Sequence, residues 1–356
     1  MRVLAWVPQQ LGTSPGQRFR IEQWAPQLIG HGIDIGFSPF AGPELTSRLA
    51  SSGRLVAKAR GILGALARRL AEAYRAPRPD LVYIFRESAL LGPSLAERVL
   101  GLRGIPFVFD FDDAVWVRYV SPTNGPLSYL RFPGKTATLC RRARHVLAGN
   151  NFLREYALHH NTRVSVIPTT IDTQQYAPQP HPPGRLPVIG WSGSLSTVQY
   201  LELVRPALET LARRRSFRLK VVGGSGVAVR GIEVECLPWR PDTEVADIAS
   251  FDVGLMPLPN DEWARGKCGL KALQYMALAV PAVVSPVGVN TEIVDHGRNG
   301  LLAATEADWV EGLDRLLTDP RMRHDMGEAA RITVEQRYSA RVVAPEVAGI
   351  LREAAL

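Results

Sequence analysis

Short apolar runs rich in β-branched residues alternate with longer segments of helical periodicity along most of the chain. The first half contains predicted strands at residues 2–7, 33–37, 81–85, 107–110, 145–148 and 163–168. The pattern then restarts, with predicted strands at residues 187–191, 217–222, 232–236, 251–256 and 282–285. Helical segments such as residues 19–28 and 200–214 separate them. This alternation predicts an α/β protein with two halves, each a parallel sheet covered by helices.

A proline-rich segment at residues 177–187 separates the two halves. Proline fixes φ and lacks an N–H group, so this segment is predicted to be a linker. A length of 356 residues also favours two domains over one core. We therefore expect an N-terminal domain over residues 1–178 and a C-terminal domain over residues 187–338. The amphipathic helix predicted for residues 339–356 is expected to pack back toward the N-terminal domain.

The composition, 46% hydrophobic with both charge signs well represented, is typical of a globular protein. No apolar run is long enough to cross a bilayer, and the N-terminus lacks the features of a signal peptide. The three cysteines are far apart in sequence, which disfavours a disulfide framework and a zinc site. These features predict a cytoplasmic protein without a zinc site.

The net charge of +8 comes partly from a basic amphipathic segment at residues 54–75. A helix of this kind can lie on an anionic membrane surface, which would place the protein on the inner face of the plasma membrane as a peripheral protein. An ordinary domain helix with solvated arginines is an equal alternative. Nucleic acid is not an expected partner, because no basic run is interleaved with aromatic residues.

Three glycine-bearing loops follow predicted strands, at residues 12–16, 193–194 and 223–226. In open parallel sheets, ligands bind where such loops lead into helices, and backbone amides there bind anions. Gly12, Gly16, Gly193 and Ser194 are therefore candidate phosphate-binding residues, and Arg18 follows the first loop closely enough to assist. None of the loops fits the dinucleotide fingerprint of redox enzymes.

Two lysines lie near the start of a helix predicted for residues 267–277. Lys267, Lys271 and Gln274 have the spacing of one helical face. Cations oppose the positive end of the helix dipole, and an anion bound there would resolve the conflict. A diphosphate is the predicted ligand, and a pair of solvated lysines is the alternative.

Residues 251–303 resemble the donor-domain core of the family 4 glycosyltransferases, which have the GT-B fold. The resemblance lies in Phe-Asp-Val-Gly-Leu-Met-Pro-Leu at residues 251–258 and in Leu-Lys-Ala-Leu-Gln-Tyr-Met-Ala at residues 270–277. Residues 166–172 and 308–338 also resemble the family. The resemblance implies two Rossmann-like domains facing an interdomain cleft. It implies a nucleotide diphosphate sugar bound by the second domain, an acceptor bound by the first, and transfer with retention of configuration and without a metal.

The family's paired glutamates correspond here to Gly266 and Gln274. Gln274 can still hydrogen-bond a ribose hydroxyl, whereas the role of the first glutamate is either lost or passed to Asp261 or Glu262. The loop at residues 192–197 lacks the cations that the family often carries there. We therefore infer that Lys267 and Lys271 carry the positive charge that binds the phosphates, as a variation within the family.

Asp110, Asp112 and Asp113 end a predicted strand of the first domain, so their carboxylates are expected to point into the cleft. They are the candidate catalytic residues, able to orient or deprotonate an acceptor hydroxyl. One alternative is a metal site of the other glycosyltransferase fold, GT-A. Another is a helix N-cap with solvated acids.

The sequence thus predicts a glycosyltransferase acting on a glycan or lipid-linked saccharide of an envelope or exported polysaccharide, with no cofactor besides its nucleotide-sugar substrate. The alternative function is that of an inactive GT-B paralogue that binds sugar nucleotide or glycan without turnover. The substitution of Gly266 for the first glutamate favours this alternative.

Overall fold

The structure is a computed structural model that describes all residues except 51–54, 76, 91, 118–131, 133 and 181–183. The chain forms two compact units. Unit 1 comprises Met1–Thr169 and Val343–Leu356, and unit 2 comprises Thr170–Val342. Part of the predicted linker (181–183) and the first residue of the basic segment, Arg54, lie outside the described residues.

Unit 1 contains a six-stranded parallel sheet in the order β2-β1-β3-β4-β5-β6. Its strands are β1 (Arg2–Val7), β2 (Asp34–Pro39), β3 (Leu81–Phe85), β4 (Phe107–Phe111), β5 (His145–Ala148) and β6 (Val164–Val166). The central strands β3 and β4 are buried along their whole length, as expected for apolar runs covered on both faces. All six predicted strands are confirmed: β1, β3 and β5 have the predicted bounds, and the ends of β2, β4 and β6 differ by no more than two residues.

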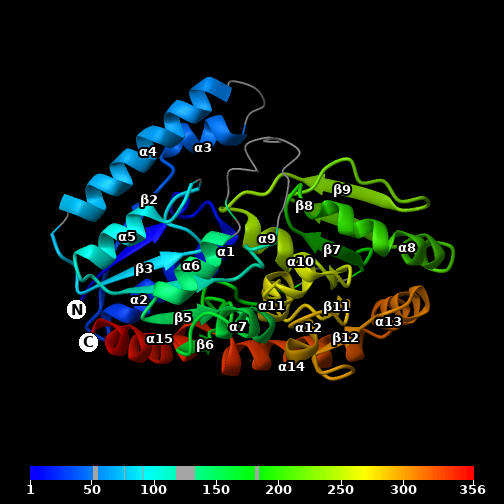
Figure 1. The fold of residues 1–356 in the computed structure, drawn as a ribbon. Helices are drawn as coiled ribbons and strands as arrows, with labels where there is room; N and C mark the ends of the chain where they lie inside the picture. The colour runs from blue at the N-terminus through cyan, green and yellow to red at the C-terminus, as the bar shows by residue number, and fades with distance from the viewer. Residues whose placement is uncertain (51–54, 76, 91, 118–131, 133, 181–183) are drawn as a thin grey trace. The chain divides into compact units, whose positions relative to one another are not determined.

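The helices of unit 1 are α1 (Pro15–Gln17), α2 (Gln23–Ile29), α3 (Pro43–Ala50), α4 (Leu55–Arg75), α5 (Leu95–Leu102), α6 (Gly134–Arg142), α7 (Asn151–Leu158) and α15 (Ala340–Ala355), the last of which begins in unit 2 (Figure 1). A π-helical turn, η1 (Arg18–Glu22), interrupts the helix predicted for residues 19–28. Within it, Arg20 has non-helical angles of φ −127° and ψ −109°. The described helices include none that is both long and apolar enough to cross a membrane.

Unit 2 contains a second six-stranded parallel sheet in the order β12-β11-β10-β7-β8-β9. Its strands are β7 (Val188–Ser192), β8 (Arg218–Val222), β9 (Glu233–Leu237), β10 (Val253–Met256), β11 (Ala282–Val284) and β12 (Gly300–Leu302). The prediction missed β12, whose three residues are too few to show a period. The two parallel sheets confirm the predicted α/β class.

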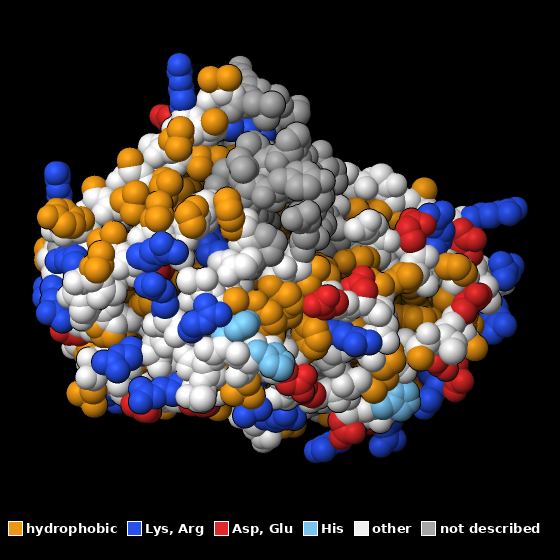
Figure 2. Space-filling view, in the orientation of Figure 1, with side chains coloured by type: hydrophobic (Ala, Val, Ile, Leu, Met, Phe, Trp, Pro, Cys, Tyr) orange, Lys and Arg blue, Asp and Glu red, His pale blue; other side chains and the backbone are white. Residues whose placement is uncertain are grey.

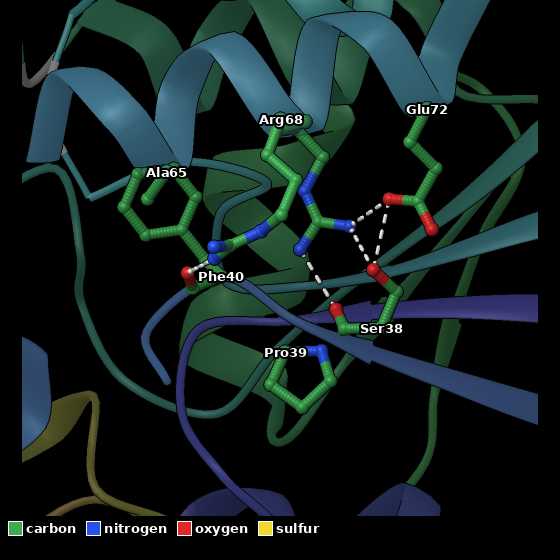
Figure 3. Close-up of a pocket in the computed structure, with 7 residues that line it drawn as sticks. Ser38, Pro39, Phe40, Ala65, Arg68 and Glu72 are labelled. Carbon is green, nitrogen blue, oxygen red and sulfur yellow. Dashed lines mark hydrogen bonds and ion pairs between the residues drawn. The ribbon is translucent and has the colours of Figure 1, made fainter. Parts of the chain in front are cut away.

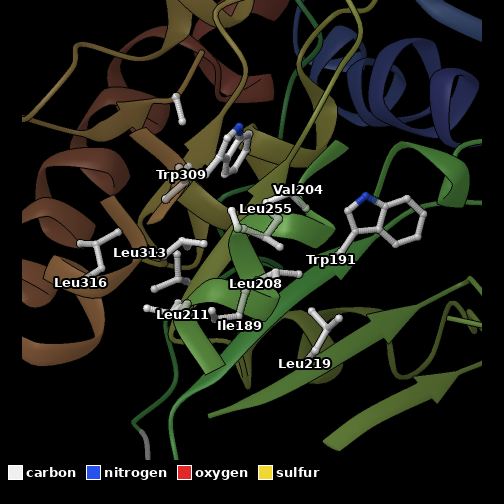
Figure 4. Packing of buried hydrophobic residues seen from close by; sticks show 14 of the residues in the cluster. Ile189, Trp191, Val204, Leu208, Leu211, Leu219, Leu255, Trp309, Leu313 and Leu316 are labelled. Atoms are coloured by element: carbon white, nitrogen blue, oxygen red, sulfur yellow. The ribbon is translucent and has the colours of Figure 1, made fainter. Parts of the chain in front are cut away.

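Helices of unit 2 pack on this sheet around an apolar core (Figure 4). They are η3 (Val198–Leu203), α8 (Arg205–Ala212), α9 (Glu244–Ala249), α10 (Glu262–Arg265), α11 (Leu270–Ala277), α12 (Asn290–Ile293), α13 (Glu306–Thr318) and α14 (Pro320–Arg337). The helix predicted for residues 200–214 is divided into the 3₁₀ helix η3 and α8. Pro206, in the first turn of α8, has no N–H to continue a helix from the preceding turn.

Candidate functional site

Two loops meet at the carboxyl end of the unit 2 sheet. The Gly193 N–H donates to the Val222 carbonyl (2.9 Å), and the Gly223 N–H donates to the Leu237 carbonyl (2.8 Å). Gly223 has φ +81°, and a Cβ at this position would lie 2.1 Å from the carbonyl oxygen of Gly193. The loop after β7 and the loop after β8 therefore pack directly against each other, which a larger residue at 223 would prevent.

Lys271 reaches this pair of loops from the first turn of α11. Its Nζ lies 4.4 Å from the centroid of the Trp191 ring and 3.4 Å from Thr197 Oγ1. A Cβ on Gly193 would lie 2.9 Å from Lys271 Cε, so the side chain runs close beside the loop. Among the described residues, no carboxylate forms an ion pair with Lys271. Gly193 and Lys271, which the sequence separately suggests as phosphate-binding residues, are thus neighbours in the structure.

The electrostatic environment of Lys271 is unfavourable to its charge. Burial, together with a smaller effect of the positive charge of Lys267, lowers the pKa of the Lys271 ammonium from 10.5 to about 7. A cation–π contact with Trp191 offsets only part of this cost. An anion at the loops would compensate the charge, so this arrangement is suited to binding one.

The structure corrects the position of Lys267. It lies in the turn between α10 and α11, and not on the face of a helix, because α11 begins only at Leu270 after Gly269, which has φ +71°. The predicted spacing of one helical face is therefore wrong for Lys267. Its Nζ lies 4.6 Å from the centroid of the Trp263 ring, and its charge still acts on Lys271.

Gln274 is 3% exposed and belongs to a buried polar network. Its Nε2 donates to Tyr176 Oη (3.2 Å) and to Glu244 Oε1 (3.1 Å). Glu244 also accepts from Tyr176 Oη (2.8 Å) and from Trp239 Nε1 (2.9 Å). Sequence reasoning missed Glu244, which is 30 residues from Gln274 in the chain and belongs to no shared motif. The ribose-binding role of Gln274 stays a prediction, and these contacts commit its amide nitrogen to the protein.

Gly266 is the C-cap of α10 and supplies no side chain at the position of the first motif glutamate. Of the two proposed substitutes, Asp261 caps the N-terminus of α10 and accepts from the Ala264 N–H (2.7 Å). Glu262 is exposed.

In unit 1, the predicted aspartates fall into two separate environments. Arg86 holds Asp112 and Asp113 at the carboxyl ends of β3 and β4, with Nε 2.5 Å from Asp112 Oδ1 and Nη2 2.6 Å from Asp113 Oδ2. Arg86 has φ +55°, which is unusual for a residue with a side chain. A Cβ on Gly16 would lie 2.3 Å from Asp112 Oδ2, so Gly16 directly adjoins this cluster. Sequence reasoning missed Arg86.

Asp110 lies in the core of unit 1, contrary to the expectation that its carboxylate points into a cleft. Arg20 binds both of its oxygens, with Nε 2.7 Å from Oδ2 and Nη2 2.6 Å from Oδ1, and Tyr83 Oη donates to Oδ2. All three residues are completely buried. Burial raises the pKa of the Asp110 carboxyl, while the Arg20 charge acts in the opposite direction. A catalytic role stays a prediction for all three aspartates, and Asp112 and Asp113 are the two with some exposure.

The remaining phosphate-binding candidates, Gly12, Arg18 and Ser194, contact other groups of the protein. The Gly12 N–H donates to Glu22 Oε2 (2.9 Å), so this amide is occupied by a carboxylate of unit 1. The Arg18 guanidinium lies 5.1 Å from the centroid of the Phe19 ring. In unit 2, the Ser194 N–H donates to Thr197 Oγ1 (3.2 Å). The described residues contain no group of three or more side chains suited to hold a metal ion.

A pocket of about 160 Å³ lies at the carboxyl end of β2, beneath α4 (Figure 3). The Arg69 guanidinium forms hydrogen bonds inside this pocket. It donates to the Ser38 carbonyl (2.7 Å), to Ser38 Oγ (2.7 Å) and to Glu72 Oε2 (2.7 Å). Arg68 donates to the Phe40 carbonyl (2.9 Å). Burial lowers the pKa of Arg69 to about 10, with Glu72 opposing the effect. This closed network indicates that the pocket mainly secures α4 on the sheet.

The contact between the two glycine loops can be tested by a matched pair of substitutions. We expect Gly226→Ala to cost about 1 kcal/mol, because Gly226 has φ +72° but open space around it. Gly223→Ala should cost at least about 2 kcal/mol, because the added Cβ meets the Gly193 carbonyl as well. Urea unfolding of both variants measures the difference. Equal losses would show that the loops do not depend on this contact.

Comparison with known protein families matches both units of the chain. The profile for "Glycosyltransferase Family 4" matches residues 16–175, and that for "Glycosyl transferases group 1" matches residues 186–319. The chain belongs to the family 4 glycosyltransferases. The recognition of the family from residues 251–303 is thereby confirmed.

Relatives of this family 4 glycosyltransferase include two proteins named D-inositol 3-phosphate glycosyltransferase. The one from Pseudarthrobacter chlorophenolicus is 36% identical over 95 residues, which is 26% of this chain and 21% of that protein. The one from Corynebacterium jeikeium is 30% identical over 169 residues, 42% of this chain and 39% of that protein. The chain therefore matches less than half the length of these curated relatives.

Solved structures resemble this family 4 glycosyltransferase along nearly its whole length. Sucrose-phosphate synthase from Thermosynechococcus elongatus has a TM-score of 0.70 at 15% identity, covering 99% of this chain and 98% of that one. The Anabaena protein HepE in complex with UDP has a TM-score of 0.66 at 18% identity, covering 99% and 100%. Together with the two parallel sheets, these similarities confirm the GT-B fold and set aside the GT-A alternative.

Proposed function

We propose that this family 4 glycosyltransferase moves a sugar from a nucleotide diphosphate sugar to a glycan or lipid-linked saccharide. The observation that carries the proposal is Lys271, a partly buried cation without a carboxylate partner in the described chain, placed against the loops at residues 192–194 and 223–226. A diphosphate supplies the missing negative charge. As the bond to the sugar breaks, negative charge grows on the leaving diphosphate, and a preorganised cation stabilises it.

The other parts of the proposal rest on the family and on unit 1. Transfer is proposed to retain the anomeric configuration and to need no metal or other cofactor. Lys267 adds positive charge near the diphosphate, and the amide oxygen of Gln274 accepts from a ribose hydroxyl. Asp112 and Asp113, fixed by Arg86, are the carboxylates proposed to orient or deprotonate the acceptor hydroxyl. The protein is proposed to act in the cytoplasm at the inner face of the membrane.

A thermal-shift screen with UDP, GDP, ADP and their sugars tests the donor. UDP is the first probe, because HepE, a protein of similar fold, is known in complex with UDP and with UDP-glucose. A ligand that binds the folded state raises the melting temperature by mass action. We expect one nucleotide to give a shift that excess EDTA leaves unchanged. Absence of any shift at millimolar nucleotide would contradict the donor site.

The proposed contact also predicts how nucleotide affinity depends on pH. In the free protein, Lys271 loses its proton near pH 7, whereas a bound diphosphate raises this pKa. Affinity is therefore greatest below pH 7 and falls by up to about tenfold for each pH unit above 7, until the pKa of the complex is reached. Titration calorimetry between pH 6.5 and 9 measures this slope. A constant affinity over that range would mean that Lys271 is not the titrating contact.

The second candidate function is that of an inactive paralogue that binds sugar nucleotide or glycan. The absence of a side chain at Gly266 favours it. Slow hydrolysis of the nucleotide sugar by the purified protein separates the two candidates. An active transferase releases free nucleoside diphosphate with water as acceptor, and an inactive binder gives a thermal shift without release.

A further inference from the structure

The outward face of α4 is unusually apolar for a helix on the surface of a soluble unit. Val56, Leu63 and Tyr74 are 69%, 64% and 71% exposed. Their spacing of 7 and 11 residues places all three on one stripe of the helix, together with the exposed Ala67. The opposite face is anchored in unit 1 through Ile62, Ala65 and Arg69. A helix seated on a core normally presents charged residues to water, and α4 presents a hydrophobic stripe.

Among the described residues of α4, basic side chains lie beside this stripe and acidic ones do not. Arg60, Arg68 and Arg75 are exposed and lie along one side of it. Glu72 is the only acidic residue in positions 55–75, and it is bound to Arg69 and Ser38 at the buried side of the helix. Figure 2 shows apolar side chains gathered over the region that Figure 1 labels α4, with basic side chains among them.

The neighbouring helix α3 adds no net negative charge to the outward surface of α4. Its exposed carboxylate, Glu44, lies 3.3 Å from the Arg48 guanidinium, so the pair is close to neutral. The outward face of α4 therefore combines large apolar side chains with three exposed cations and no exposed carboxylate of its own. This is the pattern of a helix that lies in the interface of an anionic bilayer, with apolar side chains in the acyl boundary and arginines at the lipid phosphates.

We propose that the outward face of α4, defined by Val56, Arg60, Leu63, Tyr74 and Arg75, docks unit 1 onto a bilayer containing anionic phospholipid. This deepens the membrane part of the proposed function and is independent of the donor site in unit 2. Charge complementarity selects the bilayer over a second copy of the chain, because two such faces would bring like-charged arginines together. Tyr74 suits the level of the headgroups, where aromatic rings with a polar end are enriched.

Sedimentation with vesicles tests the docking surface. Vesicles of phosphatidylcholine alone are compared with vesicles containing 30% phosphatidylglycerol, at about 0.1 M and 0.5 M NaCl. We expect binding to the anionic vesicles and a marked loss at high salt. The triple variant Val56→Ser, Leu63→Ser, Tyr74→Ser should bind at least about tenfold more weakly. Arg60→Gln and Arg75→Gln should each weaken binding about fivefold, the equivalent of roughly 1 kcal/mol per charge.

Matched controls lie on α7, which packs against β5 and β6 at the other end of the unit 1 sheet. Leu158→Ser and Arg154→Gln remove an exposed apolar side chain and an exposed cation there, and both should leave vesicle binding unchanged. All variants should keep the cooperative melting transition of the wild type without ligand, which shows that they fold. If the nucleotide shift is absent in wild type but vesicle binding follows this pattern, the donor proposal fails and the docking surface stands.

Three results would overturn the inference. Wild-type protein could bind neutral and anionic vesicles equally, or neither. The triple variant could bind anionic vesicles as strongly as wild type. Light scattering could show a wild-type dimer that the triple variant converts to a monomer, which would assign the stripe to self-association.

Discussion

Replacing Lys271 by methionine is expected to weaken binding of the matching nucleoside diphosphate about a hundredfold while leaving the free protein as stable as before, or more stable. Methionine keeps most of the apolar stem beside Trp191 and removes the ammonium, whose charge is disfavoured without a ligand. With the diphosphate bound, the same charge is compensated, and its loss removes a strong contact from a partly buried site. Titration calorimetry and urea unfolding of the same preparation measure the two effects.

A substitution that weakens nucleotide binding without lowering the stability of the free protein indicates that the lysine serves the ligand site. A structural lysine would lower the stability when it is replaced. Lys220→Met is the matched control, because Lys220 is another partly buried lysine of unit 2 but has Glu235 as its partner at 3.6 Å. It should leave nucleotide affinity unchanged. A loss of stability in Lys271→Met with unaltered affinity would assign Lys271 to the fold of unit 2.

Replacing Arg20 by methionine is expected to destabilise unit 1 by about 3–5 kcal/mol, because it leaves the Asp110 carboxylate buried without its counter-ion. The protein can reduce this cost by protonating Asp110, so the loss should shrink as the pH falls toward the raised pKa of the carboxyl. Urea unfolding followed at pH 5 and pH 8 measures the loss and its pH dependence.

Two further variants test whether the buried Arg20–Asp110 pair differs in its energetics from an exposed ion pair. Arg20→Met combined with Asp110→Leu should regain most of the stability, since an apolar pair of similar volume replaces both charges. It removes the acceptor of the Tyr83 hydroxyl and the Arg20 donor to the Ile167 carbonyl, which are both neutral groups. Arg48→Met, which removes the exposed pair with Glu44, should change stability by less than about 1 kcal/mol. If Arg20→Met behaves like Arg48→Met, Asp110 is not held by this ion pair.

The candidate site was only partly predictable from the order of residues. Glycine loops after strands and lysines near the start of α11 suggested Gly193 and Lys271 as phosphate-binding residues, and the two are neighbours because the carboxyl ends of parallel strands meet at one edge. Because Asp110, Asp112 and Asp113 are close together in the sequence, all three carboxylates were expected to point into the same cleft. The structure instead places Asp110 in the core with Arg20 and leaves Asp112 and Asp113 with Arg86. The partners are 90 and 26 residues away along the chain.

By itself the sequence determined every described strand except the short β12, because buried parallel strands are apolar over their length and leave a local signal. It also determined the division into two α/β halves and the family. Tertiary structure alone decided which charges are compensated. Glu244 joins Gln274 across 30 residues, and Lys271 meets Trp191 across 80 without a carboxylate nearby in the described chain. Burial and ion pairing depend on residues brought together by folding, and no local pattern records them.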